Sequence, residues 1–154
     1  MKFTYDKSAD GWTLLENTKP VKLKIKDLQL SEFLKNGEIS INGDEMAKRA
    51  KESGSNFRQS EAEWLLKNQE KIPTEWQKYY IAFPGTVWRD SCGDRNVPFL
   101  FWRGDGWYLG FRWLEGDWDS IDRVLRSRKV ASVPLRQSNT TEKLTSTNDK
   151  RLKP

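Results

Sequence analysis

The chain of 154 residues contains no histidine and one cysteine, Cys92. Histidine has the side-chain pKa nearest neutrality and is the commonest metal ligand, so its absence removes the usual general base and the usual zinc site. One cysteine excludes an internal disulfide and a centre built from several thiolates. We therefore expect neither a metal nor another cofactor, and an enzyme is the less favoured class.

Long apolar runs are also lacking. No stretch approaches the roughly 18 consecutive apolar residues that span a bilayer, and residues 1–6 lack the apolar segment of a signal peptide. We expect a cytoplasmic monomer without a membrane partner. Mean hydropathy is low, −0.85, because polar residues gather at the two ends. The length favours one domain, over 1–130, followed by a polar, basic and disordered tail over 131–154.

Tryptophan is the residue that the chain has in abundance. Seven of its eight tryptophans lie in one stretch: Trp64, Trp76, Trp88, Trp102, Trp107, Trp113 and Trp118. Each buries roughly 200 Å² and carries an N–H group that needs a partner. This stretch therefore forms either a heavily aromatic core or a partly exposed aromatic surface.

The first third of the chain predicts short strands and turns. The expected elements are a hairpin of strands 2–5 and 12–16, a strand over 21–26, a helical turn over 31–35 and a short strand or loop over 38–43. In the strand over 21–26, lysines alternate with apolar residues, a pattern that more often protects a sheet edge than binds phosphate.

Two helices are expected next. The first covers 44–52 and ends before Gly54, and the second begins at a capping box formed by Ser60 and Glu63 and ends at Pro73. Its apolar face is typical of a helix packed on a sheet.

Residues 79–114 change to a period of two, which predicts four antiparallel strands in meander order. The expected strands are 79–83, 86–89, 97–103 and 107–114. A turn over 117–120 then leads into a helix from Ile121. The predicted fold is α+β, an antiparallel β-meander sheet packed by two or three short helices.

A two-residue turn at 104–106 would fix the faces of the last two strands. One face, expected to be the core, holds Leu100, Trp102, Trp107, Leu109, Phe111 and Trp113. The other holds Phe99, Phe101, Arg103, Tyr108, Arg112 and Leu114. Exposed aromatic rings and guanidinium groups on a sheet can stack unpaired bases and hold phosphates. The alternative, which we favour because exposed phenylalanines lower solubility, is that helices cover this face.

Positive charge gathers at the C-terminal end. Residues 123–154 carry nine Lys/Arg against two Asp/Glu, and a basic cluster is formed by Arg123, Arg126, Arg128 and Lys129. Such a cluster can contact polyanions through counterion release. The alternative is a solvated helix end followed by a tail that serves solubility.

Three segments resemble a known group of proteins. Residues 63–76, FPGTVWR at 83–89, and Trp118 to Arg123 resemble small tryptophan-rich proteins encoded in bacterial candidate-phylum genomes. The resemblance covers about residues 60–129. It implies a freestanding domain of bacterial or phage origin and transfers no catalytic residue.

These features favour a non-enzymatic module that binds nucleic acid. Its expected contacts are Arg103, Tyr108, Arg112, Arg123, Arg126, Arg128 and Lys129. One alternative is a protein-interaction or inhibitor module, related to phage, that uses exposed tryptophans as anchors. A weaker alternative is a hydrolase built on turn carboxylates at Asp94, Asp105, Asp117, Asp119 and Asp122.

Overall fold

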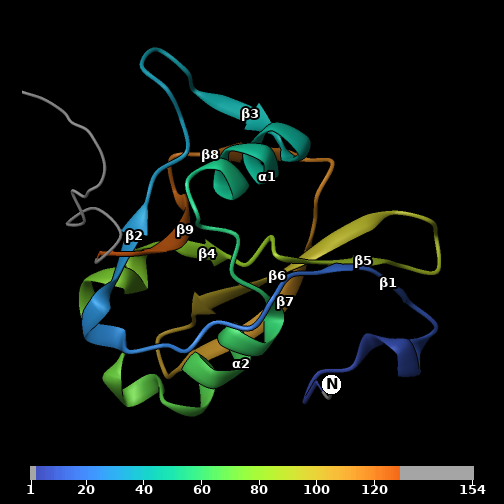
Figure 1. Ribbon diagram of the computed structural model, residues 1–154, viewed down its shortest axis with the longest axis horizontal. Coiled ribbons are helices and arrows are strands. Elements are labelled where there is room, and N and C mark those ends of the chain that lie inside the picture. Colours follow the sequence, from blue (N-terminus) through green and yellow to red (C-terminus); the bar gives the residue numbers. More distant parts are fainter. Residues whose placement is uncertain (1–2, 129–154) are drawn as a thin grey trace, which may run out of the picture.

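The computed structural model describes residues 3–128 (Figure 1). The predicted α+β class is confirmed, with two α-helices beside a curled, mostly antiparallel sheet. The helices are α1 (Gly43–Glu52) and α2 (Gln59–Lys67). The strands are β1 (Thr13–Asn17), β2 (Leu28–Ser31), β3 (Ser40–Asn42), β4 (Tyr80–Ala82), β5 (Thr86–Arg89), β6 (Arg95–Trp102), β7 (Trp107–Trp113), β8 (Asp117–Asp119) and β9 (Asp122–Ser127). The proposed tail over 131–154 lies outside the described residues.

The strand order differs from the predicted meander. It runs β1-β5-β6-β4-β9-β2, with β7 on β6, while β3 and β8 form a separate pair. Strands β4 and β5 both pair with β6, and β4 also pairs in parallel with β9. The cause is the bend at Pro84-Gly85. A Cβ atom on Gly85 would lie 2.1 Å from the Asn56 carbonyl oxygen, so only glycine lets the chain pass there.

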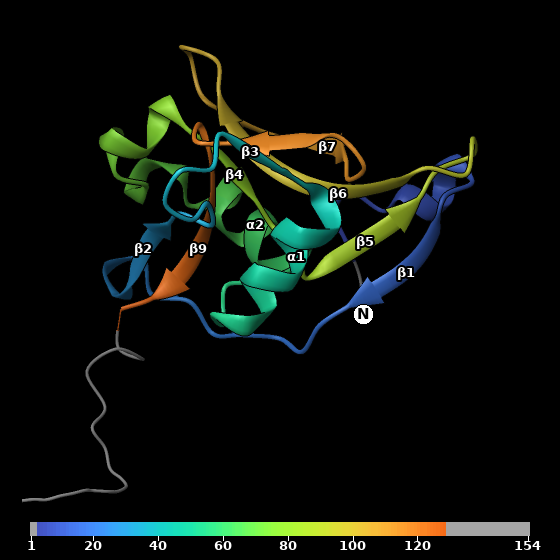
Figure 2. The same cartoon turned by 90° about the horizontal axis from the view of Figure 1, so that it is seen from above.

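Side chains from the two faces of this sheet enter two separate cores. The first core holds Ala62 and Leu65 of α2 with Ile81, Leu100 and Leu125, among others. The second holds Met46 and Ala50 of α1 with Ala82, Val97 and Val124. Neighbours such as Ile81 and Ala82 point to opposite faces, as the period of a strand requires. Figure 2 shows β1 and β5 on one side of the molecule, β2 and β9 on the other, and α1 between them.

A buried polar network joins α2 to the N-terminal segment and to β5. The fully buried Gln59 accepts a hydrogen bond from Trp88 Nε1 at 2.7 Å, and its amide group donates to the Tyr5 carbonyl at 2.6 Å and to Glu63. Glu63 also accepts from the backbone N–H groups of Thr4 and Tyr5. The predicted capping box is therefore wrong, since Arg58 and Glu61 cap the helix instead and Glu63 is used for this tertiary contact.

Several expectations for the N-terminal third are also wrong. No hairpin joins 2–5 to 12–16: residues Lys7–Asp10 form a 3-10 turn and β1 pairs with β5. The strand expected over 21–26 is irregular, and the helical turn expected over 31–35 is absent. The short strand expected over 38–43 is present as β3. Long-range pairing of β1 and β2 overrides local propensity in this region.

The helix expected from Ile121 is a strand, β9. Its residues Val124 and Leu125 are both buried, one in each core, because β9 lies between β4 and β2. Pairing with β2 on one side and β4 on the other satisfies the backbone N–H and C=O groups of this segment. Within the described residues, no helix is long and apolar enough to cross a membrane.

Candidate nucleic-acid interface

The hairpin of β6 and β7 has the register that the tight turn predicted. Arg103 N donates to the Gly106 carbonyl at 3.0 Å, and Gly104 adopts a φ of 94° that favours glycine. Trp102 lies opposite Trp107, and Phe101 lies opposite Tyr108. The two predicted sets of side chains therefore lie on opposite faces of the hairpin.

The face predicted to be the core is covered by α2 over most of its length. Leu100 and Trp107 are buried against this helix, and Trp102 and Leu109 pack at the margin of the same core. The prediction is wrong for Trp113, which is 53% exposed. This tryptophan lies at the far end of β7, opposite Asn96 and outside both hydrophobic cores.

The opposite face divides into a covered end and an open end. At the covered end, Val97 and Leu114 are buried in the core that contains α1. At the open end, Phe99 and Phe101 are half-buried and Tyr108 is 38% exposed. The expectation that helices cover this face is therefore wrong for the part that carries the aromatic rings.

Four rings form a continuous row across the open end, which we name the aromatic face: Tyr80, Phe99, Phe101 and Tyr108. The ring centroids of Tyr80 and Phe99 are 5.9 Å apart, those of Phe99 and Phe101 are 5.0 Å apart, and those of Phe101 and Tyr108 are 6.1 Å apart. Tyr80 comes from β4 and was missed in the sequence, because only the pairing of β4 with β6 brings it beside Phe99.

Gly110 lets the two phenylalanine rings lie against the strand. It sits opposite Phe99 on β7, and an added Cβ atom would lie 3.0 Å from Phe99 Cε1 and 3.3 Å from Phe101 Cε1. Such distances are tighter than ordinary contacts, so any side chain here would push the rings away from the sheet.

One cationic group stands at the end of the row: the Arg103 guanidinium lies 4.9 Å from the Tyr108 ring centroid. A second cluster lies on the opposite face of the sheet, where Arg123 stacks 4.2 Å from the ring of Tyr79 and Lys78 Nζ lies 5.5 Å from the same ring. Cations over aromatic rings are held in place by the ring quadrupole.

Arg112 has a different role from the one that its sequence position predicted. It forms an ion pair with the buried Asp122, donates to the Asp117 carbonyl at 3.0 Å, and lies 4.0 Å over the Trp118 ring. These contacts fix it as a wall beside the rings. With Tyr80, Phe99, Phe101 and others it lines a hollow of about 370 Å³.

The remaining basic residues do not join this surface. Arg123 and Arg126 lie on opposite faces of β9, since their positions differ by an odd number. Arg126 pairs with Gln29 in the sheet, and Arg128 Nε donates to the Leu28 carbonyl at 3.1 Å. Lys129 lies outside the described residues. The three described members of the predicted basic cluster are thus distributed around the strand rather than gathered on one patch.

The five turn carboxylates do not form one cluster: Asp117, Asp119 and Asp122 lie in β8 and β9, beyond the β6–β7 hairpin. Asp94 and Asp105 flank opposite ends of β6, and within residues 3–128 no three cysteine or acidic side chains come together as metal ligands. The Asp90 carboxylate accepts a hydrogen bond from the backbone N–H group of Asp94. This bond is the main reason that the pKa of Asp90 is lowered.

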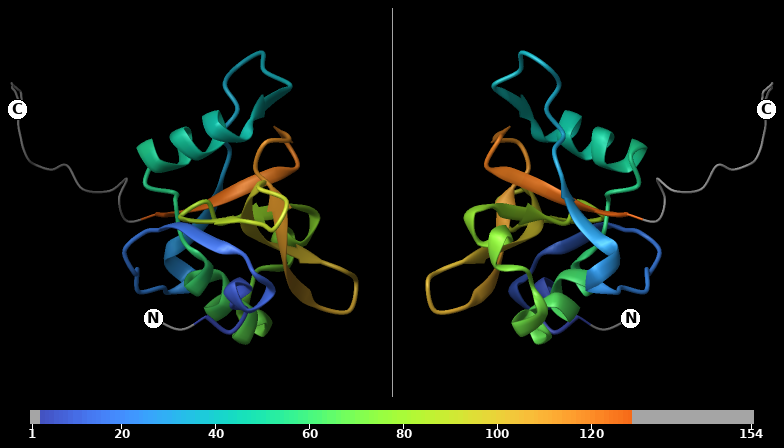
Figure 3. Two further views of the ribbon diagram at one scale, coloured as in Figure 1. Left: turned by 90° about the vertical axis from the view of Figure 1, so that its right-hand side faces the viewer. Right: turned by 90° about the vertical axis from the view of Figure 1, so that its left-hand side faces the viewer.

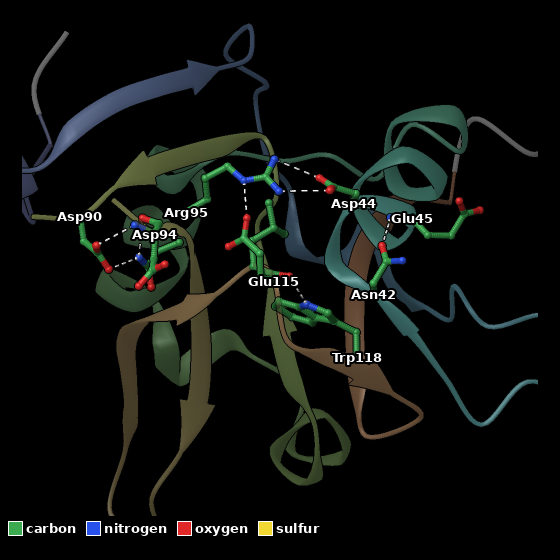
Figure 4. A network of polar contacts seen from close by, with 10 residues as sticks. Asn42, Asp44, Glu45, Asp90, Asp94, Arg95, Glu115 and Trp118 are labelled. Atoms are coloured by element: carbon green, nitrogen blue, oxygen red, sulfur yellow. Dashed lines mark hydrogen bonds and ion pairs between the residues drawn. The ribbon is translucent and has the colours of Figure 1, made fainter. Parts of the chain in front are cut away.

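Arg95 holds two further carboxylates beside this turn. It contacts Glu115 at 2.6 Å and Asp44 of α1 at 3.0 Å, and the hydrogen bonds that it donates, first to Asp44 and then to Glu115, raise its pKa (Figure 4). Figure 4 shows Asp44 and Glu115 turned toward Arg95. Their ion pairs with Arg95 tie α1 to the start of β6 and to the turn that follows β7.

Comparison with protein-family models, curated proteins and solved structures finds no match for this chain. Its function is therefore inferred from the geometry of its own surfaces.

Proposed function

We propose that this protein is a non-enzymatic module that binds single-stranded nucleic acid, with unpaired bases stacked on the aromatic face. The observation that carries the proposal is the uncovered row of four rings on the sheet. Every base has a flat face, so stacking on such rings is tolerant of sequence and contributes roughly 1 to 3 kcal/mol per base. Duplex bases are already stacked on one another, so the preference is for unpaired strands.

The phosphate contact on this path comes from Arg103, which stacks on Tyr108 at the end of the row. A phosphate that passes around the edge of the sheet would meet Lys78 and Arg123 beside Tyr79 on the opposite face. Arg112 orients the wall of the hollow, because its charge is already matched by Asp122. Arg126 and Arg128, which lie on β9 and directly after it, stand outside this path. We place the protein in the cytoplasm as a monomer, with one such face per molecule.

The test is fluorescence polarisation of labelled 12-nucleotide DNA, single-stranded and duplex, at low and moderate salt. We expect binding to the single strand, a loss of roughly 5- to 100-fold in Tyr108→Ala, and a fall with salt that is smaller in Arg103→Ala. Trp113→Ala is the control, because this aromatic residue is even more exposed than Tyr108 and lies off the aromatic face. Absence of binding at low salt, or equal affinity in wild type and Tyr108→Ala, would reject the proposal.

A further inference from the structure

A second surface lies apart from the aromatic face. It is a groove of about 690 Å³, lined by Leu23, Lys24, Ile25, Lys26, Leu28, Trp64, Lys71, Pro73 and Arg128, which we name the basic groove. Figures 2 and 3 show the segment between β1 and β2, which supplies its wall, on the opposite side of the molecule from the tip of the β6–β7 hairpin. A ligand of either surface leaves the other uncovered.

The lining combines an apolar floor with a cationic rim. Trp64 is 38% exposed although it belongs to α2, whose neighbouring Leu65 is fully buried. Its ring and the aliphatic side chains of Leu23 and Ile25 offer surface to an apolar side chain. Exposed tryptophans of this kind are frequent anchors in protein interfaces.

The rim carries charge of one sign. All four ionisable residues of the lining are basic, and Lys24, Lys26 and Lys71 form no ion pair with any residue in 3–128. By contrast, Arg49 and Arg95 are each paired with two carboxylates. Lysines left without such partners around an apolar floor favour a ligand that is both acidic and apolar.

The backbone beside the groove is also open. Residues 18–24 belong to no strand, and in this segment Val21 N donates to Glu61 while the N–H groups of Lys22 and Leu23 have no partner among the described residues. Two more hollows, of about 270 and 430 Å³, adjoin the same residues, Val21 to Lys24. An extended peptide can pair with such free backbone groups while its alternate side chains enter hollows of this kind.

We infer that the basic groove is a docking site for an extended, acidic segment of a partner protein. Its apolar side chains would lie on Trp64 and Leu23, its carboxylates on Lys24, Lys26 and Lys71, and its backbone along Lys22 and Leu23. A nucleic-acid strand fits less well, because the floor is mostly aliphatic and a sugar–phosphate chain cannot pair with peptide N–H and C=O groups in strand fashion. This site is independent of the function proposed for the aromatic face.

Selection from a random peptide display library on the full chain tests the inference. We expect enrichment of peptides that combine Asp or Glu with Leu, Phe or Trp. A fluorescently labelled peptide from this selection should bind at least about tenfold more weakly to Trp64→Ala and to the double variant Lys24→Glu, Lys26→Glu. It should keep its affinity for Lys48→Glu, Lys51→Glu, a matched charge reversal on the exposed surface of α1, and for Tyr108→Ala.

Three results would overturn the inference. They are the absence of any selected peptide, the selection of peptides without acidic residues, and equal binding to wild type and the groove double variant. Displacement of the peptide by a 12-nucleotide single strand, retained in Tyr108→Ala, would assign the groove to nucleic acid instead. Failure of oligonucleotide binding with intact peptide binding would reject only the function proposed for the aromatic face.

Discussion

The two faces of the β6–β7 hairpin carry similar residues and have different surroundings. On one face, Leu100 and Trp107 are buried against α2. On the other face, Phe99, Phe101 and Tyr108 are partly exposed to solvent. Aromatic content therefore does not decide which face of this sheet is core. What decides is whether a helix crosses it, and α1 reaches only the end that holds Val97 and Leu114.

Truncating one side chain on each face of the hairpin should give the largest difference in stability between the covered face and the open face. Leu100→Ala removes a fully buried side chain beneath α2 and should lower the free energy of unfolding by about 2 to 5 kcal/mol. Tyr108→Ala, on the open face, should cost less than about 1 kcal/mol. Urea denaturation followed by tryptophan emission measures both. A large loss of stability in Tyr108→Ala would mean that the open face is part of the core.

Gly110→Ala should disturb the open face and leave the covered face intact. The new methyl group would meet Phe99 and Phe101, so we expect a loss of about 1 to 3 kcal/mol in stability and weaker binding of single-stranded DNA. The control is Gly116→Ala, whose Cβ atom would have only an ordinary contact, 3.7 Å from the Trp113 carbonyl oxygen. Unchanged DNA affinity in Gly110→Ala would show that the flat arrangement of the rings is not required.

Low pH should weaken the attachment of α1 to the rest of the protein. The packing of α1 over Val97 and Leu114 should weaken with it. Two hydrogen bonds from Arg49 and one from the Lys35 backbone lower the pKa of Glu38 from 4.5 to about 2. A carboxyl with a depressed pKa in the folded state stabilises that state above its unfolded pKa, so the contribution disappears as pH falls from about 4.5 to about 2. This effect is the smallest of the three, because the pair is near the surface.

The melting temperature between pH 6 and pH 2.5 provides the measurement. Wild type should lose more stability over this range than Glu38→Gln, whereas Glu52→Gln, at an exposed position of α1, should follow wild type. Parallel curves for wild type and Glu38→Gln would contradict the assigned role of this ion pair.

Local patterns in the sequence were sufficient for part of this architecture. Asp44–Glu52 and the apolar spacing around Leu65 predicted both helices, because a 3.6-residue period is a property of one segment. The alternation in 97–103 and 107–114 predicted the hairpin and its two faces, because either two-residue turn, Gly104-Asp105 or Asp105-Gly106, gives the same two faces.

Long-range pairing accounts for most of the errors. The strand β9 was expected as a helix, since nothing within 121–127 shows that β4 and β2 lie on its two sides. Tyr80 was not predicted as part of the aromatic face, because the pairing of β4 with β6 is also long-range. The ion pair of Arg112 with Asp122 could not be predicted for the same reason. These residues lie on β7 and β9, and the chain between them, which includes β8, brings them together.

The sequence by itself determined which side chains share a face of the hairpin and where the two helices form. Only the tertiary structure decided which face is open, where the unpaired lysines gather around Trp64, and how β4 is shared between β6 and β9. The physical reason is that periodicity and turn geometry act between neighbours along the chain. Burial and charge pairing depend on which distant segments lie alongside, and those contacts exist only in the folded protein.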